Sequence, residues 1–258
     1  MTALETIAVA FAMFSALPVP QPVWNERNMR YALCAFPLVG TAVGICWWGW
    51  SALCGFLEAP ALLRAAGLCA LPALVTGGIH LDGYADTCDA LASCGSVEKK
   101  RSILEDPHCG AFAVIRLCLY FVLMLGICSA LPADPRTLCC AGLGFMLSRA
   151  LSGFAVAAFP LAKDTGLAHT FAAAADRVAV RRVLLALSML LCAGLIAVGD
   201  WAGAGMALAA LAVLAHYRRT ARVQFGGLSG DLAGWFLQRC EFWMLAVLAV
   251  SRMMEAKR

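Results

Sequence analysis

Charged side chains are scarce in this sequence. Only 14% of its 258 residues are Asp, Glu, Lys or Arg, whereas 62% are hydrophobic, and the mean hydropathy is +0.80. A soluble globular domain carries about 25% charged residues. The composition therefore excludes a protein whose main solvent is water, and most of the chain is expected to lie in a lipid bilayer.

Paired cysteines and internal repeats are also lacking. The 13 cysteines include no C-x-x-C pair, and only Cys139 and Cys140 are adjacent. Scattered singly through apolar runs, the cysteines indicate small buried residues rather than zinc ligands or a disulfide framework. The absence of a visible repeat gives no support to a transporter built from two similar halves. The sequence is interpreted as one domain, residues 1–258.

Eight apolar runs make up most of the chain. A bilayer core about 30 Å thick requires roughly 20 apolar residues per helix, so the sequence predicts an all-α, polytopic membrane bundle with about six to eight transmembrane helices. The first and seventh runs are short and are expected to be short spans, re-entrant or half-inserted. No cleavable signal peptide is expected, because the first run lacks a basic start. The runs cover about 3–17, 31–57, 61–79, 110–131, 137–159, 183–199, 201–215 and 231–251.

The basic residues lie in short clusters between the apolar runs. We interpret the net charge of +4 as a topology signal and expect no nucleic-acid partner. Counted over alternate connections, 12 Lys and Arg residues fall on one side and 5 on the other. The positive-inside rule places the larger group in the cytoplasm, and predicts a multi-pass protein of the cell inner membrane with its active site facing the cytoplasm. The larger group is Arg27, Arg30, Lys99, Lys100, Arg101, Lys163, Arg177, Arg181, Arg182, Arg218, Arg219 and Arg222, and the smaller is Arg64, Arg136, Arg252, Lys257 and Arg258.

The most informative polar segment follows the third apolar run. At about 100° per residue, Asp86 and Asp89 lie within about 40° of Asp82 around a helix axis, so the three carboxylates share one face. Near a bilayer each unpaired carboxylate costs about 2.5 to 3.5 kcal/mol, and a cation must compensate them. Clustered oxygen ligands suit Mg²⁺. Asp82, Asp86 and Asp89 are therefore predicted as catalytic metal ligands, with a solvated surface helix as the alternative.

His80 precedes the first carboxylate by two residues. At this position it is predicted to be catalytic, as a general base, a metal ligand or a phosphate donor, and the sequence leaves these roles open.

A glycine-rich stretch, Gly226–Asp231, joins a basic loop to the last apolar run. Glycines let backbone N–H groups approach an anion, and a helix start adds a favourable dipole. Gly227, Ser229, Gly230 and Asp231 are therefore predicted to bind substrate phosphate. The alternative for Asp231 is a helix N-cap.

Three other polar residues are predicted to bind substrate. Arg149 stands in an otherwise apolar run, where arginine faces a cavity, pairs or snorkels, and it is suited to bidentate phosphate binding. Its alternative is an ion pair with one of the motif carboxylates. Lys163 and Asp106 lie in loops, and their spacing alone would leave both as parts of ordinary connections.

These motifs together resemble the cobalamin synthase family, also called adenosylcobinamide-GDP ribazoletransferase. The family signature G-G-x-H-x-D-G-x-A-D-x-x-D-G is matched from Gly77 to Asp89, with Ala90 in place of its last glycine. A second departure lies in the element that resembles D-S-x-x-G-x-x-G from Asp106 onward, where Pro107 and Ala113 replace the serine and the last glycine, and none of these changes removes an acidic residue. The other matching elements lie, in the family's order, at Leu17–Pro20, Phe36–Gly40, Ser148–Arg149, Lys163–Leu167 and Gly226–Asp231.

The resemblance implies an enzyme that joins adenosylcobinamide-GDP to alpha-ribazole, or to its 5'-phosphate, and releases GMP. It implies Mg²⁺ as cofactor and leaves open whether the chain forms a homo-oligomer. One alternative is a CDP-alcohol phosphotransferase, whose D-G-x-x-A-R pattern would require arginine at Asp86. Another is a cation-coupled transporter that uses the same carboxylates as an ion site.

Overall fold

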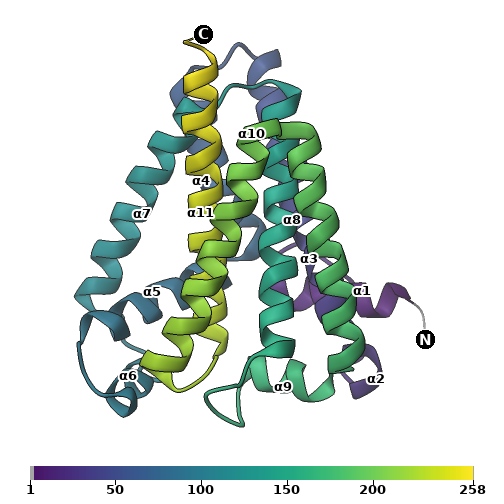
Figure 1. The fold of residues 1–258 in the computed structure, drawn as a ribbon, viewed down its shortest axis with the longest axis vertical. Coiled ribbons are helices and arrows are strands. Elements are labelled where there is room, and N and C mark those ends of the chain that lie inside the picture. Colours follow the sequence, from purple (N-terminus) through teal and green to yellow (C-terminus); the bar gives the residue numbers. More distant parts are fainter. Residues whose placement is uncertain (1–2, 258) are drawn as a thin grey trace.

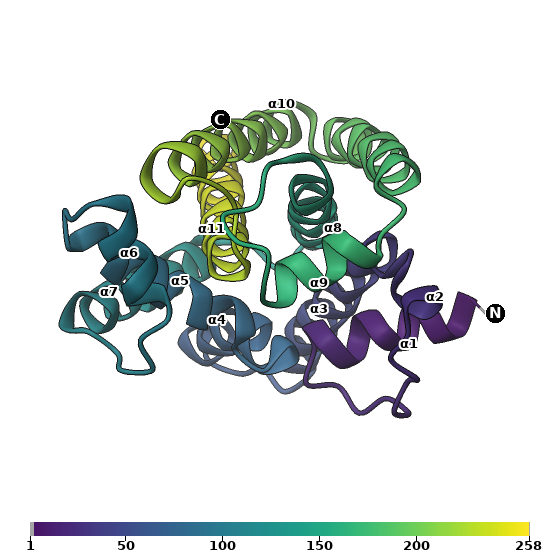
Figure 2. The same cartoon turned by 90° about the horizontal axis from the view of Figure 1, so that it is seen from below.

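The computed structural model describes residues 3–257, and the regular structure in that range is α-helical apart from one β-bridge between Leu161 and Leu228. The predicted all-α class is confirmed. Long helices form an upright bundle, and α2, α5, α6 and α9 gather at its lower end (Figures 1 and 2). Arg258 of the orientation count lies outside the described residues. The helices are α1 (Ala3–Phe14), α2 (Glu26–Met29), α3 (Ala32–Phe56), α4 (Ala61–Thr76), α5 (Ile79–Ala92), α6 (Val97–Leu104), α7 (Ala111–Ala130), α8 (Pro135–Ala158), α9 (Leu167–Ala174), α10 (Arg177–Phe225) and α11 (Gly230–Glu255).

Four helices, α3, α7, α8 and α10, are long and apolar enough to cross a membrane, and the bent pair of α4 and α5 makes a fifth if it is one span. α10 consists of two limbs, which meet at Asp200 and fold back beside each other (Figure 1). This count of four or five is lower than the expected six to eight, and it becomes six if the two limbs of α10 are counted separately. α1 has only 12 residues, about 18 Å of helix, and lies across the lower end of the bundle (Figure 2).

The chain turns sharply between α4 and α5 at Gly77 and Gly78. Both glycines have positive φ angles, of 64° and 80°, a region that residues with a Cβ occupy only with strain. The amide of Gly78 donates to the Ala73 carbonyl at 2.9 Å, and α5 lies at 96° to α4. α5 therefore runs across the end of the bundle instead of continuing along it (Figure 1).

Helix α8 lies at the centre of the bundle and packs against α3, α10 and α11 (Figure 2). Small residues allow α3 to approach it closely. A Cβ added to Gly44 would lie 3.0 Å from the Gly142 Cα, and one added to Gly40 would lie 2.4 Å from the Phe145 carbonyl oxygen. Helices in lipid associate through such close packing, so these glycines stabilise the frame that carries the lower end.

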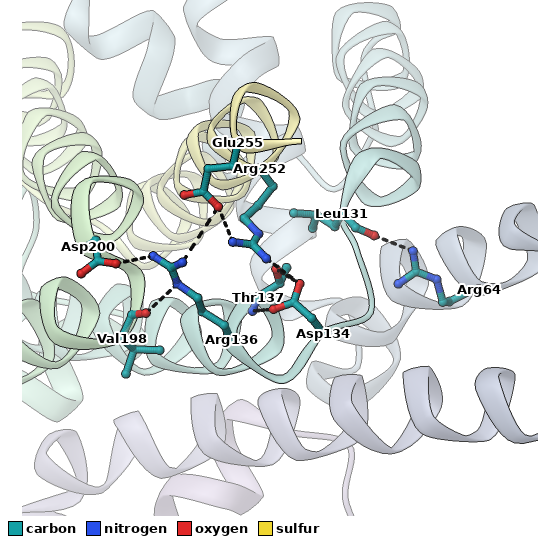
Figure 3. Close-up of polar contacts among 9 residues, drawn as sticks. All are labelled: Arg64, Leu131, Asp134, Arg136, Thr137, Val198, Asp200, Arg252 and Glu255. Carbon is teal, nitrogen blue, oxygen red and sulfur yellow. Dashed lines mark hydrogen bonds and ion pairs between the residues drawn. The ribbon is translucent and has the colours of Figure 1, made fainter. Parts of the chain in front are cut away.

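Polar contacts at the upper end join α8, α10 and α11 (Figure 3). Arg136 contacts Asp200 at 2.7 Å, and Arg252 contacts Asp134 at 2.9 Å. Nearby, Arg64 donates to the carbonyl of Leu131 (Figure 3). These three arginines belong to the smaller group of the orientation count. The larger group belongs to α2, α6, the α8–α9 loop and the lower ends of α10, so it lies at the opposite end of the bundle from the described members of the smaller group (Figure 1).

Candidate active site

The predicted acidic face is present on α5. Asp82 is exposed, Asp86 and Asp89 are half-buried, and all three occupy an unbroken helix. Carboxylates three or four residues apart on a helix have Cβ atoms about 5 to 6 Å apart and repel one another. Because α5 lies across the end of the bundle, this face is presented to the cavities and loops of the lower end and does not extend along a membrane span.

His80 points into an aromatic cluster. His80 is 6% exposed, and the centroid of its ring lies 5.7 Å from that of Phe36 and 6.5 Å from that of Phe14. The Nε2 atom is buried and has no hydrogen-bond partner among the described residues. A buried polar atom without a partner is costly, and other parts of His80 line the cavity described below.

The start of α11 packs against α5 at two glycines. A Cβ added to Gly83 would lie 2.7 Å from the Asp231 carbonyl oxygen, and one added to Gly234 would lie 2.8 Å from the His80 carbonyl oxygen. The first turn of α11 therefore meets the acidic helix directly. Ser229 is the N-cap, since its Oγ accepts from the Leu232 amide at 3.3 Å. The alternative of Asp231 as N-cap is wrong. Asp231 instead lines the two cavities described below.

Gly227 occupies a packing position. A Cβ there would lie 2.5 Å from the Ala162 amide nitrogen and from backbone atoms of Leu161. The Gly227 amide donates to the Ala221 carbonyl and the Leu228 amide donates to Pro160, both at 2.9 Å. These N–H groups cannot cradle a phosphate as predicted. In this stretch the remaining candidate donors are the Gly230 and Asp231 amides at the start of α11, because Ser229 accepts from the Leu232 and Ala233 amides.

Two cavities adjoin at the acidic helix. The first, which we call the aromatic cavity, has a volume of about 470 Å³ and is lined by Phe14, Phe36, His80, Phe171 and Ser229, among others. The second, the acidic cavity, has a volume of about 840 Å³. Asp82, Glu105 and Asp231 line both. The structure thus brings the predicted residues His80, Asp82, Asp86, Asp106, Lys163, Ser229, Gly230 and Asp231 to one connected region.

Loop residues close the outer side of this region. Lys163 Nζ lies 2.9 Å from Glu105 Oε1, and this contact holds the pKa of Glu105 below its usual range. Asp106 Oδ1 accepts from the His108 amide at 2.9 Å, which lowers the pKa of Asp106. Sequence reasoning missed Glu105 and His108. Their position beside Asp106 was the only signal in the sequence. The ion pair of Glu105 could not be predicted, because its partner, Lys163, is distant in the chain.

Asp89 is separated from the other two carboxylates by its surroundings. Its carboxylate lies against Gly110, where an added Cβ would be 2.2 Å from both oxygens, and Gly110 is the N-cap of α7. Asp89 does not line either cavity. A helix N-terminus carries a partial positive charge, so the start of α7 provides a partner for Asp89 that Asp82 does not have.

Arg149 is buried in the core and not beside the acidic face. Its side chain has 0% exposure and forms an ion pair with Glu241 of α11. It also donates to the Phe145 carbonyl at 2.9 Å. The predicted alternative of a motif carboxylate as partner is wrong, because that partner is Glu241. Arg149 lines neither cavity, and the missed signal was Glu241, a carboxylate in the interior of the last apolar run.

The predicted metal ligands do not form a site that is complete by itself. Within residues 3–257, no three His, Cys, Asp or Glu side chains are arranged to hold a metal ion. The donor set nevertheless fits Mg²⁺ shared with a substrate, because Asp82, Asp86 and Asp231 line the acidic cavity. Mg²⁺ commonly takes one or two carboxylates and completes its shell with water and substrate phosphates.

Comparison with known proteins identifies the group to which these features belong. The profile of the cobalamin-5-phosphate synthase family matches residues 6–249. The chain belongs to this family. Curated relatives named adenosylcobinamide-GDP ribazoletransferase include proteins of Lachnoclostridium phytofermentans (41% identical over 96% of this chain and 93% of the relative), Geobacillus kaustophilus (31%, over 93% of each) and Pseudomonas fluorescens (32%, over 94% and 98%). No solved structure matches the chain. The resemblance inferred from the motifs is confirmed. The cobalamin-5-phosphate synthase profile covers α5 and all the residues that line the aromatic and acidic cavities.

Proposed function

We propose that the protein joins adenosylcobinamide-GDP to alpha-ribazole, or to alpha-ribazole 5'-phosphate, releases GMP and forms adenosylcobalamin or its 5'-phosphate. Membership of the family and the names of its relatives support a transferase of cobalamin biosynthesis. The observation that carries the proposal is the pair of adjoining cavities, one aromatic and one acidic, whose common wall includes Asp82 and Asp231.

The two cavities suit the two substrates. Alpha-ribazole contains a flat aromatic base, which the rings of Phe14, Phe36 and Phe171 can bind by stacking. The diphosphate of adenosylcobinamide-GDP then lies on the acidic side, where the larger and more open cavity leaves room for the corrinoid outside. This assignment places the ribose of one substrate beside the diphosphate of the other, at Asp82.

The reaction forms one P–O bond and breaks another. A ribose hydroxyl attacks the phosphorus attached to the cobinamide side, GMP leaves with the electron pair of the broken bond, and the hydroxyl proton passes to a base. His80 lines the aromatic cavity, and we assign to it the role of the base that accepts this proton. The first-turn N–H groups of α11 and Lys163 are near enough to the cavity to bind phosphate oxygens.

Asp82 and Asp86, with Asp231 facing them, would hold Mg²⁺ between the protein and the diphosphate. When bound, the ion would neutralise the charge that develops on the phosphoryl and leaving oxygens. The like-charged face explains why a cation is needed there, since nearby Lys163 is already paired with Glu105.

We further propose that the α5 end faces the cytoplasm. The larger basic group lies at this end, and the smaller group lies around Arg136 and Arg252. Cytoplasmic loops carry the excess of Lys and Arg in membrane proteins. The substrates, as large polar molecules, would then reach the site from water without crossing the bilayer.

One incubation tests the proposed reaction. Purified protein in lipid is mixed with adenosylcobinamide-GDP, alpha-ribazole and Mg²⁺, and products are identified by mass spectrometry. We expect a joined corrinoid together with one GMP per product. Well-folded protein that gives neither product contradicts the proposal. Uptake of either substrate into sealed vesicles without GMP release would instead support the transporter alternative.

A further inference from the structure

A third cavity, distinct from the two described above, opens on the side of the bundle between α5, α7 and α11. We call it the lateral cavity. Its volume is about 430 Å³. Tyr84 and Cys88 of α5 contribute to its wall. They lie about 200° around the helix from Asp82 and Asp86, so the lateral cavity is behind the acidic face and not part of it.

Two arginines in the lateral cavity have no acidic partner. Arg116 of α7 and Arg239 of α11 both line it, and its lining contains no Asp or Glu. Among the described residues neither arginine forms an ion pair. Arg239 lies over the ring of Trp235, 4.7 Å from its centroid, and 3.4 Å from His216 Nε2. Neither contact neutralises its charge.

The cavity mouth is apolar. Leu119 is 49% exposed, Leu123 is 55% exposed and Trp243 is 46% exposed, and all three line the cavity. Leu119 and Leu123 belong to α7, whose exposed face is composed of large hydrophobic residues as expected for a surface in contact with lipid. The mouth therefore opens toward acyl chains and not toward water.

The depth of the arginines matches that of lipid headgroups. Arg116 is the sixth residue of α7 and Arg239 the tenth of α11, so they lie about 8 Å and about 14 Å along their helices from the lower end. Charged side chains within a membrane segment pair or face a cavity, because leaving them unpaired there is costly. Tryptophan near this level is typical of the membrane interface.

We propose that the lateral cavity binds one anionic phospholipid. Its phosphate lies between Arg116 and Arg239, and an acyl chain runs along Leu119 and Leu123 into the bilayer. Arginine matches a phosphate group well because its planar guanidinium can donate two hydrogen bonds to it. The apolar mouth favours a lipid over free phosphate, which has no apolar part to bury.

Native mass spectrometry of the full-length protein tests this proposal. The protein is released from bilayers containing equal amounts of phosphatidylglycerol and phosphatidylcholine, and retained lipids are counted. The parent should retain one phosphatidylglycerol. Each basic residue near an anionic lipid contributes about fivefold in affinity, so the double variant Arg116→Gln, Arg239→Gln should retain it about thirtyfold less well. The matched double variant Arg182→Gln, Arg222→Gln removes the same charge from the lower ends of α10 and should retain it like the parent.

A second variant separates lipid binding from any effect on folding. Leu123→Trp keeps both arginines and fills the mouth, so it should lose the retained lipid while its melting temperature without added lipid stays close to that of the parent. Equal retention in the parent and the arginine double variant would overturn the proposal, as would equal retention of phosphatidylcholine. Displacement of the lipid by millimolar inorganic phosphate would identify a phosphate site instead. A dimer mass without bound lipid would assign the cavity to a second copy of the chain.

Discussion

Gly83 of α5 is in backbone contact with Asp231 of α11, so close that a Cβ at residue 83 would lie 2.8 Å from the Asp231 Cα. The acidic helix and the start of α11 are therefore positioned by each other. Any side chain at residue 83 must push Asp231 away from Asp82, with which it forms the wall shared by the two cavities.

Gly83→Ala should reduce turnover at least about tenfold, because it displaces Asp231 from Asp82, and the overpacking should cost about 1 to 3 kcal/mol of stability while the protein still folds. Turnover and melting temperature are measured together. Gly126→Ala is the control, since Gly126 has open space around its Cα and the substitution should be neutral or slightly stabilising. Unchanged turnover in Gly83→Ala would show that the spacing of α5 and α11 does not matter for catalysis.

Asp82→Asn and Asp86→Asn should each reduce transfer on the order of 100-fold or more, because a bound divalent ion contributes several kcal/mol to transition-state stabilisation. Thermal stabilisation by Mg²⁺ and substrate should also decrease, since a ligand stabilises only the state that binds it. Asp164→Asn is a matched control in an exposed loop at the same end, outside the lining of both cavities. Turnover near the parental value in either α5 variant would remove that carboxylate from the mechanism.

Arg149→Met should lower the free energy of unfolding by about 3 to 5 kcal/mol, because it leaves Glu241 buried without its partner. The double variant Arg149→Met, Glu241→Leu should recover most of this loss, since neither charge then remains in the core. Chemical denaturation in detergent measures both. A single variant that is as stable as the parent but has a raised KM for adenosylcobinamide-GDP would restore the predicted phosphate-binding role of Arg149.

The orientation can be tested with cysteines placed at the two ends of the bundle in a background without native thiols. Lys99→Cys, Lys163→Cys and Arg219→Cys should be protected from an impermeant thiol reagent in intact cells, whereas Lys257→Cys at the upper end should be labelled. Opening the cells should make the first three reactive. Labelling of the first three from outside would reverse the proposed orientation.

Helical periodicity was sufficient to predict the features that lie within one helix. The carboxylates of α5 are separated by whole turns, so their common face follows from about 3.6 residues per turn. Apolar run length likewise predicted the helices. The N-cap of α11 was not predicted correctly, because Ser229 and Asp231 are equally good capping residues and only the helix start, at Gly230, decides between them.

Features that depend on contacts between helices could not be predicted from the sequence. The partner of Arg149 is 92 residues away in the chain. Asp89 contacts Gly110, from which it is separated in the chain by the whole of α6. The amides of the glycine-rich stretch were predicted to be free, but Pro160 and Ala221 take two of them. In each case a short polar motif has the composition of a ligand site, while packing against a distant segment determines which of its groups remain available.

The turn at Gly77 and Gly78 also determines the position of the α5 carboxylates relative to the bilayer. A straight helix from residue 61 to residue 92 would be about 48 Å long, against a hydrocarbon core of about 30 Å. Its acidic third would be drawn into lipid or would project into water beyond the reach of α11. The corner instead ends α4 at Thr76 and turns α5 across the end of the bundle. With α5 turned in this way, Asp82, Asp86 and Asp89 would not have to cross the hydrocarbon when α4 inserts, which avoids the cost of carboxylates in lipid.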